Sequence, residues 1–453
     1  MESMTALARR LAAQTIGADA VFTRVCTDSR QIAAGDLFVA LKGERYDGHE
    51  FVSRAGAKGA VGALVSQVQD CPLPQVVVAD TLKGLQDYAR VWRTQFDLPV
   101  VAVTGSNGKT TTKQMLSAIF DSRGPTLATA GNLNNHIGLP LTLLGLRAEH
   151  RTAVIEMGAN HAGEIARLTE LTRPQIGVVT QAGDAHLEGF GSREGVARAK
   201  GELFSGLGPD SVAVINHDDA FAPLWKKQAA HCAQITFSLT ERADVSALNI
   251  EPQPAGAGIR FELRAAEGRV PVQLPLAGRH NVSNALASAS CAVALGMDLK
   301  DIAAGLARVK PAAGRLSWMT TASGARVLDD SYNANPTSLS AGLDVLAACS
   351  GLRILVLGDM GELGSDSERL HHEAGAAAKQ RGIDALYATG PLSQQAVKGF
   401  GAGAQHFADT DALISALRPR LDSRSFLLVK GSRSSRMERV VAALTGQTSE
   451  ESH

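Results

Sequence analysis

Residues 100–112 read VVAVTGSNGKTTT and indicate the fold of the middle of the chain. The pattern of a buried strand, VVAV, leads through a glycine-rich turn into the helical pattern TTKQMLSAIF at residues 111–120. Glycines let backbone amides turn toward phosphate oxygens, and a helix N-terminus adds partial positive charge. We therefore predict that this turn binds a nucleotide through Gly105, Ser106, Asn107, Gly108, Lys109, Thr110 and Thr111.

Two polar residues of this turn suit triphosphate chemistry. The Lys109 ammonium can reach the β- and γ-phosphates, and the Thr110 hydroxyl can hold Mg²⁺. The spacing departs from the common G-x-x-x-x-G-K-[ST] pattern, because Val103 stands where the first glycine would be. The alternative is a ligand-free glycine turn, but the strand-to-helix context favours nucleotide binding. The turn alone fits kinases, GTPases, motor ATPases and ligases.

The rest of the chain alternates in the same way. Strand patterns at 325–330, 353–359, 385–389 and 425–431 are each followed by a helix, and residues 244–276 show alternation typical of a hairpin insertion. Buried β-branched runs separated by amphipathic helices predict parallel sheets covered on both faces. A length of 453 residues suggests roughly three domains. We predict α/β domains at residues 1–82, 83–310 and 311–453, the first small and the other two doubly wound.

The composition narrows the class of protein. Lys and Arg together number 45, as do Asp and Glu, so the chain lacks the overall basic field of a nucleic-acid-binding protein. The five cysteines are scattered without a CxxC motif, which favours a reducing compartment. Residues 1–20 lack the apolar core of a signal peptide, and no apolar run is long enough to span a bilayer. We expect a cytoplasmic monomer that binds small molecules, with no nucleic acid and no membrane insertion.

Acidic groups and a histidine follow the next predicted strands. Glu156 ends the run VIE, and Asp184, His186 and Glu188 follow the run VVT. Ligands bind at the carboxyl ends of strands in such sheets, and a carboxylate there suits phosphate-bound Mg²⁺, although histidine is an unusual ligand. The alternatives are a helix-capping Glu156 and an ordinary loop histidine. For Lys200, on an amphipathic helical pattern, the simplest interpretation is a surface lysine.

Several motifs together carry a family resemblance. They are TDSRQIAAGDLFVALKG (27–43), TGSNGKTTTK (104–113), GNLNNHIGLPLTLL (131–144), VIEMGANHAGEI (154–165), AHLEGFGSREGVARAKGELF (185–204), GRHNVSNALAS (278–288), DDSYNANP (329–336), GDMGELG (358–364) and VKGSRSSRMERVV (429–441). The chain resembles the Mur ligases over nearly its whole length. The motifs DDSYNANP and GDMGELG resemble most closely the members that join D-alanyl-D-alanine to a UDP-N-acetylmuramoyl-tripeptide.

The resemblance implies ATP-dependent amide ligation through an acyl phosphate. It implies that Thr110, Glu156 and His186 serve magnesium, and that Lys200 is carbamylated and organises a second Mg²⁺, since a carbamate attracts Mg²⁺ and an ammonium repels it. Further ATP contacts would come from His280, Asn281, Asn284, Arg315 and Asp330. The groups of the chemical step would be Lys109, His186, Lys200 and Arg315. For GRHNVSNA, a polar cap on a core helix is a compatible alternative.

The resemblance also assigns the substrates. The uridine diphosphate end would lie on the first domain, against Ser29, Arg30, Lys42, Asp47 and His49. The peptide-bearing part would contact Asn134 and Asn135, and the dipeptide would contact Asn333, Asn335, Lys430 and Ser432. DSR and DGH are equally typical of ordinary turns and caps. Lys430 and Arg433 could pair a terminal carboxylate or form a solvated basic face with Arg436 and Arg439.

Four alternatives remain open. A third-residue-adding Mur ligase would carry a DNPR motif, which the sequence lacks. Folylpolyglutamate synthetases lack the uridine domain and DDSYNANP. A regulatory GTPase would need a guanine-reading NKxD, and the nearest run, at residues 216–219, reads NHDD. The fourth is a binding module without catalysis.

Overall fold

The computed structural model describes residues 2–185, 187–253 and 258–446. It divides into two compact units, which are described separately below. The first contains residues 1–102, 124–158 and 166–174, and the second contains residues 103–123, 159–165 and 175–453. Within the described ranges, no helix has both the length and the apolar character needed to cross a bilayer.

The first unit begins with a small mixed sheet. Its strand order is β2 (Gln14–Ile16), β7 (Gln75–Val77), β6 (Gly62–Val65), β5 (Asp36–Val39) and β4 (Arg24–Cys26). All neighbours are parallel except β2 and β7. A short ladder joins β1 (Glu2–Ser3) to β3 (Val21–Phe22). The helices are α1 (Met4–Arg10), the 3₁₀ turn η1 (Gly48–Phe51) and α2 (Val52–Ala57).

The remainder of the first unit leads into the middle of the chain. Helix α3 (Thr81–Arg93) starts at Asp80, whose side chain accepts a hydrogen bond from the Lys83 amide. Trp92 lies on the same helix, and its indole N–H donates to the Leu146 carbonyl at 3.2 Å. Strand β9 (Thr126–Ala128) pairs in parallel with β10 (Thr152–Glu156), and α5 (Gly138–Leu143) lies between them in sequence.

Strand β8 (Val100–Thr104) has residues in both units. Within the second unit the hydrogen-bonded order is β16-β15-β14-β13-β12-β11. In the second unit β11 (Ile176–Val179), β12 (Val212–Asn216), β13 (Ala233–Ser238) and β14 (Val245–Pro252) are parallel. Strands β15 (Ile259–Ala265) and β16 (Gly268–Leu274) continue the sheet antiparallel. All five residues of β8 are buried, as expected for a strand covered on both faces.

Helix α6 (Glu164–Thr172) lies mostly in the first unit. The helices of the second unit in this part are α4 (Lys109–Phe120), α7 (Leu187–Phe190), α8 (Arg193–Ser205), α9 (Ala222–Gln228), α10 (Arg279–Ala294) and α11 (Leu299–Ala307). Helices α4 and α11 pack closely, because a Cβ on Gly305 would lie 2.5 Å from the Cα of Ile119. Helix α10 lies beside α4 as well, with the Ser288 hydroxyl donating to the Thr112 carbonyl at 3.3 Å.

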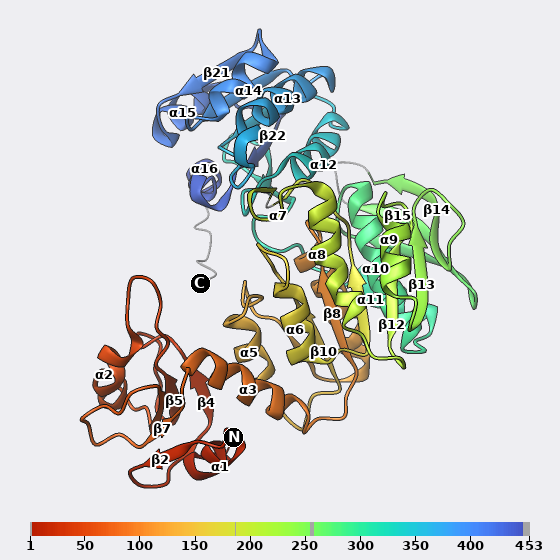
Figure 1. Ribbon diagram of the computed structural model, residues 1–453. Helices are drawn as coiled ribbons and strands as arrows, with labels where there is room; N and C mark the ends of the chain where they lie inside the picture. Colours follow the sequence, from red (N-terminus) through yellow and green to blue (C-terminus); the bar gives the residue numbers. More distant parts are fainter. Residues whose placement is uncertain (1, 186, 254–257, 447–453) are drawn as a thin grey trace. The chain divides into compact units, whose positions relative to one another are not determined.

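The last part of the second unit is built on a six-stranded sheet. Its order is β17 (Ser317–Thr320), β18 (Arg326–Asp330), β22 (Ser425–Lys430), β19 (Leu352–Leu357), β20 (Ala385–Thr389) and β21 (Ala404–Phe407), antiparallel only at β17. One core cluster joins the sheet to α12 (Pro336–Ala347), α13 (Ser367–Gln380) and α14 (Ser393–Phe400). A second joins it to α15 (Thr410–Leu417) and α16 (Glu438–Thr445) (Figure 1). The sheet is therefore covered on both faces.

The architecture confirms the α/β class and the doubly wound sheets predicted from the sequence. The hairpin predicted at 244–276 is the β14–β16 segment. Strands β2, β17 and β21 were not predicted. They are edge strands of three or four residues, too short to show a period in the sequence.

Candidate active site

The predicted phosphate-binding turn, residues 105–108, has the geometry expected from its glycines. Gly105 has φ +141° and Gly108 has φ +83°, both in the region that favours glycine. A Cβ on Gly105 would lie 1.9 Å from Thr180 Oγ1, and one on Gly108 would lie 2.3 Å from Asn284 Oδ1. Neither position has room for a side chain, so both glycines are required by the packing as well as by the backbone.

Helix α4 starts directly after this turn. Gly108 is its N-cap and has no side chain that could accept a hydrogen bond from the first turn. Such an end favours an anion. The Lys109 ammonium lies over the same turn and donates to the carbonyls of Gly105 (2.7 Å) and Ser106 (3.3 Å). Thr110 and Thr111 occupy the first turn of α4, half-buried beside Lys109.

The loop after β11 holds the turn in place. Thr180 Oγ1 donates to the Asn107 carbonyl at 2.6 Å. The Ser106 amide donates to the Gln181 carbonyl at 2.9 Å, and the Gly183 amide donates to Ser106 Oγ at 2.9 Å. Sequence reasoning missed Thr180. The available signal was a threonine that ends a buried strand just before the acidic loop.

Lys200 lies in the interior, not on the surface. It belongs to α8, is 1% exposed, and donates to the Ala159 carbonyl at 3.1 Å. Its ammonium lies 5.1 Å from the centre of the Phe190 ring. Burial, and then the positive charge of Lys109, lowers the pKa of Lys200 from 10.5 to about 7. The surface-lysine interpretation is therefore wrong, and much of this amine is neutral near pH 7.

The predicted metal ligand Glu156 lies at the end of β10, in the first unit, and is 2% exposed. Its Oε1 accepts a hydrogen bond from Asn134 Nδ2 at 2.8 Å. Two residues predicted for different ligands are therefore in contact. The side chain of Asn135 instead accepts from the amides of Ile137 and Gly138 at the start of α5. His186 lies outside the described residues.

Helix α10 brings the GRHNVSNA motif to the phosphate-binding turn. Asn284 lies against Gly108, and its Nδ2 donates to Asn281 Oδ1 at 3.1 Å. The side-chain Nδ2 of Asn281 donates to the Ala277 carbonyl at 2.7 Å. Burial, and then the positive charge of Lys430, lowers the pKa of His280 to about 4, so His280 is neutral at physiological pH.

In the last part of the chain, two residues predicted to contact different ligands form a buried ion pair. Lys430 is 1% exposed and Asp330 is 8% exposed. The Lys430 ammonium donates to Asp330 Oδ2 and, at 3.0 Å, to the Asn333 carbonyl. Burial raises the pKa of Asp330, against the lowering effect of Lys430. The pair links the ends of β18 and β22.

Asn335 contacts the phosphate-binding turn within the second unit. It is the N-cap of α12, and its Oδ1 accepts from the Ser338 amide at 2.8 Å. Its Nδ2 donates to Asn107 Oδ1 at 2.9 Å, and Asn107 Nδ2 donates back at 3.3 Å. Arg315 lies elsewhere in this part, with its guanidinium 4.2 Å from the centre of the Tyr332 ring. Ser432 is buried and follows Lys430 at the end of β22.

The predicted uridine diphosphate contacts lie in the first unit. Asp47 Oδ1 accepts from the His49 amide (3.0 Å) and lies 2.6 Å from His49 Nδ1. These contacts lower the pKa of Asp47. Lys42 Nζ lies 3.8 Å from Asp47 Oδ2. The Ser29 carbonyl accepts from Lys58, and the exposed guanidinium of Arg30 pairs with Asp28. The capping contact expected for DGH is therefore present at Asp47 and His49. The substrate role of these residues stays a prediction.

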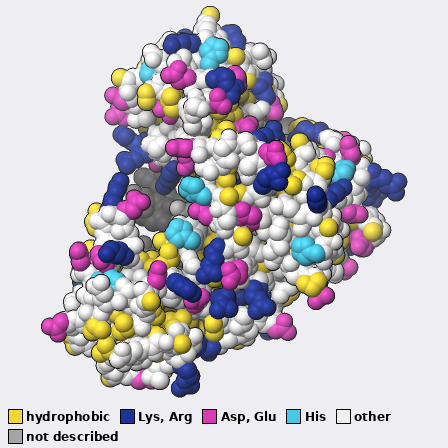
Figure 2. Space-filling model, viewed as in Figure 1, with side chains coloured by type: hydrophobic (Ala, Val, Ile, Leu, Met, Phe, Trp, Pro, Cys, Tyr) yellow, Lys and Arg dark blue, Asp and Glu magenta, His cyan; other side chains and the backbone are white. Residues whose placement is uncertain are grey.

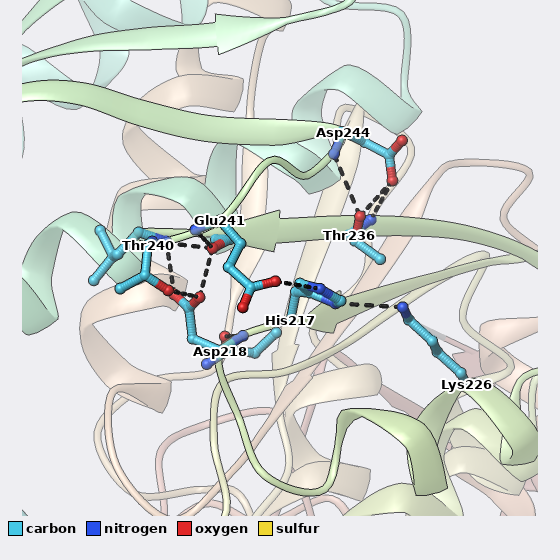
Figure 3. Close-up of polar contacts among 10 residues, drawn as sticks. His217, Asp218, Lys226, Thr236, Thr240, Glu241 and Asp244 are labelled. Atoms are coloured by element: carbon cyan, nitrogen blue, oxygen red, sulfur yellow. Dashed lines mark hydrogen bonds and ion pairs between the residues drawn. The ribbon is translucent and has the colours of Figure 1, made fainter.

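The NHDD run does not form a guanine-reading site in the described structure. Asp218 accepts hydrogen bonds from Ser238 Oγ (2.5 Å), the Leu239 amide (2.6 Å) and Thr240 Oγ1 (2.7 Å) (Figure 3). Its carboxylate is occupied by the β13 end of its own sheet. His217, where a GTPase would have lysine, lies between Glu241 and Lys226 (Figure 3).

The surface drawn in Figure 2 carries basic and acidic side chains mixed together, in keeping with the equal numbers of the two in the sequence.

Comparisons with known proteins identify the family. The family model of the Mur ligase middle domain matches residues 103–292, that of the Mur ligase glutamate ligase domain matches residues 314–433, and that of the Mur ligase family catalytic domain matches residues 21–90. The chain belongs to the Mur ligase family. This agrees with the resemblance seen in its motifs.

Individual Mur ligases match along almost their full length. The UDP-N-acetylmuramoyl-tripeptide–D-alanyl-D-alanine ligase of Escherichia coli is 47% identical over 94% of this chain and 95% of its own. A crystal structure of MurF from Acinetobacter baumannii is 38% identical, with a TM-score of 0.92 over 98% of this chain and 99% of its own. The MurF ligase from Thermotoga maritima in complex with ADP is 27% identical, with a TM-score of 0.81 over 93% and 96%. The three-domain Mur ligase architecture is thus confirmed.

Proposed function

We propose that this chain is the ATP-dependent ligase that joins D-alanyl-D-alanine to UDP-N-acetylmuramoyl-tripeptide. The product is the UDP-muramoyl-pentapeptide precursor of peptidoglycan. The observation that carries this conclusion is the 47% identity to an enzyme of that name over 94% of the chain. The family model of the Mur ligase glutamate ligase domain, which matches residues 314–433, supports the same reaction class.

The reaction needs a carboxyl group to be activated and then transferred. A carboxylate oxygen of the tripeptide attacks the γ-phosphorus of ATP, the bond to the β–γ bridging oxygen breaks, and ADP leaves. The amine of the dipeptide then attacks the carbonyl carbon of the acyl phosphate, and inorganic phosphate leaves as the amide forms. Negative charge grows on the γ-phosphoryl oxygens, so cationic groups should converge there. Lys109 and the N-terminal end of α4 suit that role.

Mg²⁺ is part of the proposal. This ion commonly uses one or two protein ligands, with phosphate oxygens and water completing the shell. The donors fit that pattern: a buried carboxylate at Glu156 and a hydroxyl at Thr110, with His186 the third predicted ligand. Among the described residues no group of three acidic, cysteine or histidine side chains forms a protein-only cage. When bound, the ions would neutralise charge on the phosphates.

We further propose that Lys200 is carbamylated. A neutral amine attacks CO₂, and the pKa of about 7 supplies one under physiological conditions. The ammonium form would lie near Lys109, whose charge already opposes it. A carbamate replaces that repulsion by attraction and offers oxygens to a second Mg²⁺. This role would explain why a lysine is buried at this position of α8.

The remaining site residues are proposed by their places in the fold. Asn281 and Asn284 adjoin the phosphate-binding turn, and with His280 they would bind the adenosine part of ATP. Arg315 would reach the γ-phosphate and Asp330 would contact the nucleotide. Catalysis by Arg315 fits a closed arrangement of the third domain, which Asn107–Asn335 hydrogen bonds would support.

The substrates would be divided among the domains. We propose boundaries at 1–82 for the uridine domain, 83–310 for the ATP-binding domain and 311–453 for the dipeptide domain. The uridine diphosphate contacts would be Ser29, Arg30, Lys42, Asp47 and His49. The peptide contacts would be Asn134 and Asn135, and the dipeptide contacts would be Asn333, Asn335, Lys430 and Ser432. We propose a monomer that works in the cytoplasm.

One assay tests the function. Phosphate release from ATP should require both UDP-N-acetylmuramoyl-tripeptide and D-Ala-D-Ala, and mass spectrometry should find the pentapeptide product. Activity with a single amino acid in place of the dipeptide would indicate a third-residue-adding Mur ligase. Activity with folate and glutamate, or turnover of GTP without an amine acceptor, would contradict the proposal.

A further inference from the structure

Two arginines of the third domain face one aromatic ring. The guanidinium carbon of Arg315 lies 4.2 Å from the centre of the Tyr332 ring, and that of Arg433 lies 5.7 Å from it. Both distances are within the range of a cation–π interaction. Tyr332 is fixed by its backbone, because its amide donates to the Gly314 carbonyl at 3.1 Å. The ring therefore holds two side chains from separate segments, one before β17 and one after β22.

Neither arginine is held in a salt bridge within the described ranges, although the charge of Arg315 acts on Asp330. No carboxylate in the described part of the chain forms an ion pair with Arg315 or Arg433. Lys430 differs, because its ammonium is buried and paired with Asp330. Of the two cationic groups that the sequence offers for a terminal carboxylate, the exposed Arg433 is therefore the one with its donors available.

The surroundings of Arg433 suit a small carboxylate. The residue follows β22, at the carboxyl end of a parallel strand, where ligands bind in open α/β sheets. Beside it, Ser432 Oγ lies 3.0 Å from Ser434 Oγ and 3.2 Å from Ser435 Oγ. These hydroxyls belong to residues next to Arg433 in the chain. A guanidinium binds a carboxylate through two parallel hydrogen bonds, which favours a planar anion.

We propose that Arg433 binds the terminal carboxylate of the incoming dipeptide and that Tyr332 is a positioning residue for both arginines. The proposal rests on the proposed function, since it names the carboxylate partner in that reaction. Arg315 then serves the phosphate that is transferred, while Arg433 serves the far end of the amine substrate. The shared ring keeps the two positive charges at fixed places despite their mutual repulsion.

The test compares D-Ala-D-Ala with D-alanyl-D-alaninamide, which lacks the carboxylate. The unchanged protein should prefer the acid, and Arg433→Gln should lower kcat/KM for the acid by roughly 10- to 100-fold, through KM. The kcat/KM for D-alanyl-D-alaninamide should fall far less, so the variant should no longer prefer the acid. The KM for ATP should not change. Arg439→Gln, which removes the same charge from α16, is the matched control and should retain the preference.

The positioning role has its own test. Tyr332→Phe keeps the ring and should behave like the unchanged protein, whereas Tyr332→Leu should raise the dipeptide KM and lower kcat together. Equal melting temperatures would show that both variants fold. If Arg433→Gln kept the full preference for the acid, or if Tyr332→Leu matched Tyr332→Phe, the proposal would be overturned. If the unchanged protein did not use D-Ala-D-Ala at all, the proposed function would fail instead.

Discussion

Replacing Lys200 by methionine should make the protein more stable and inactive. A buried lysine lowers the free energy of unfolding, because burial disfavours the charged form of the amine. Methionine has a similar length and no charge, and it suits the surroundings of Phe190. A group retained in spite of such a cost is expected to serve the chemistry, here as the carbamate proposed above.

The pKa of Lys200 gives the size of the effect. The fall from 10.5 to about 7 corresponds to about 5 kcal/mol, at 1.36 kcal/mol for each tenfold change in proton affinity. The hydrogen bond to the Ala159 carbonyl would be lost, which costs about 1–2 kcal/mol. The net gain at pH 7 is therefore about 3 kcal/mol. Between about pH 7 and 10.5 the unfolded state binds more protons than the folded state. The stability of the unchanged protein rises with pH over that window, and the gain from Lys200→Met falls to about zero near pH 10.

The assay is urea unfolding in buffer depleted of CO₂, followed by Trp225 fluorescence. Trp225 reports on α8, because its indole donates to the Ala197 carbonyl at 2.9 Å, so Trp92 and Trp318 are first changed to phenylalanine. Bicarbonate should stabilise and activate the unchanged protein but not the variant. Loss of stability at pH 7, a gain that does not depend on pH, or full activity without a response to bicarbonate would refute the reasoning.

Three further changes test other parts of the site. Gly105→Ala places a Cβ 1.9 Å from Thr180 Oγ1 and should abolish ADP binding in calorimetry; binding within twofold of normal would contradict this. Asp330→Asn leaves the buried Lys430 unpaired and should lower the free energy of unfolding by about 3–5 kcal/mol, a loss that Asp330→Asn with Lys430→Met should largely recover. Arg315→Ala should lower kcat about 100-fold while ADP affinity changes much less, and equal small effects on both would argue against its role at the transition state.

Much of the fold could be predicted from the sequence, because local patterns determine it. The strand, glycine turn and helix at residues 100–120 appear where the sequence places them. The two glycines were predictable from phosphate chemistry alone. The short edge strands β2, β17 and β21 were not, since three or four residues with one exposed edge carry too little pattern.

The site could be predicted only where a local sequence pattern indicates both the structure and the chemistry. A lysine on an amphipathic helical pattern is predicted to be exposed. Only the three-dimensional packing of α8 reveals that Lys200 is buried. The pairs Lys430–Asp330 and Asn107–Asn335 join residues far apart in the chain. No local pattern could have shown that these groups contact one another. The same applies to the two arginines at Tyr332.

Trapping the activated carboxyl group tests the central claim most directly. With ATP and UDP-N-acetylmuramoyl-tripeptide present and D-Ala-D-Ala left out, hydroxylamine should yield the hydroxamate of the tripeptide, detected by mass spectrometry. Formation should depend on ATP and should be lost in Gly105→Ala. A preparation that makes pentapeptide yet gives no hydroxamate under these conditions would contradict the acyl-phosphate route.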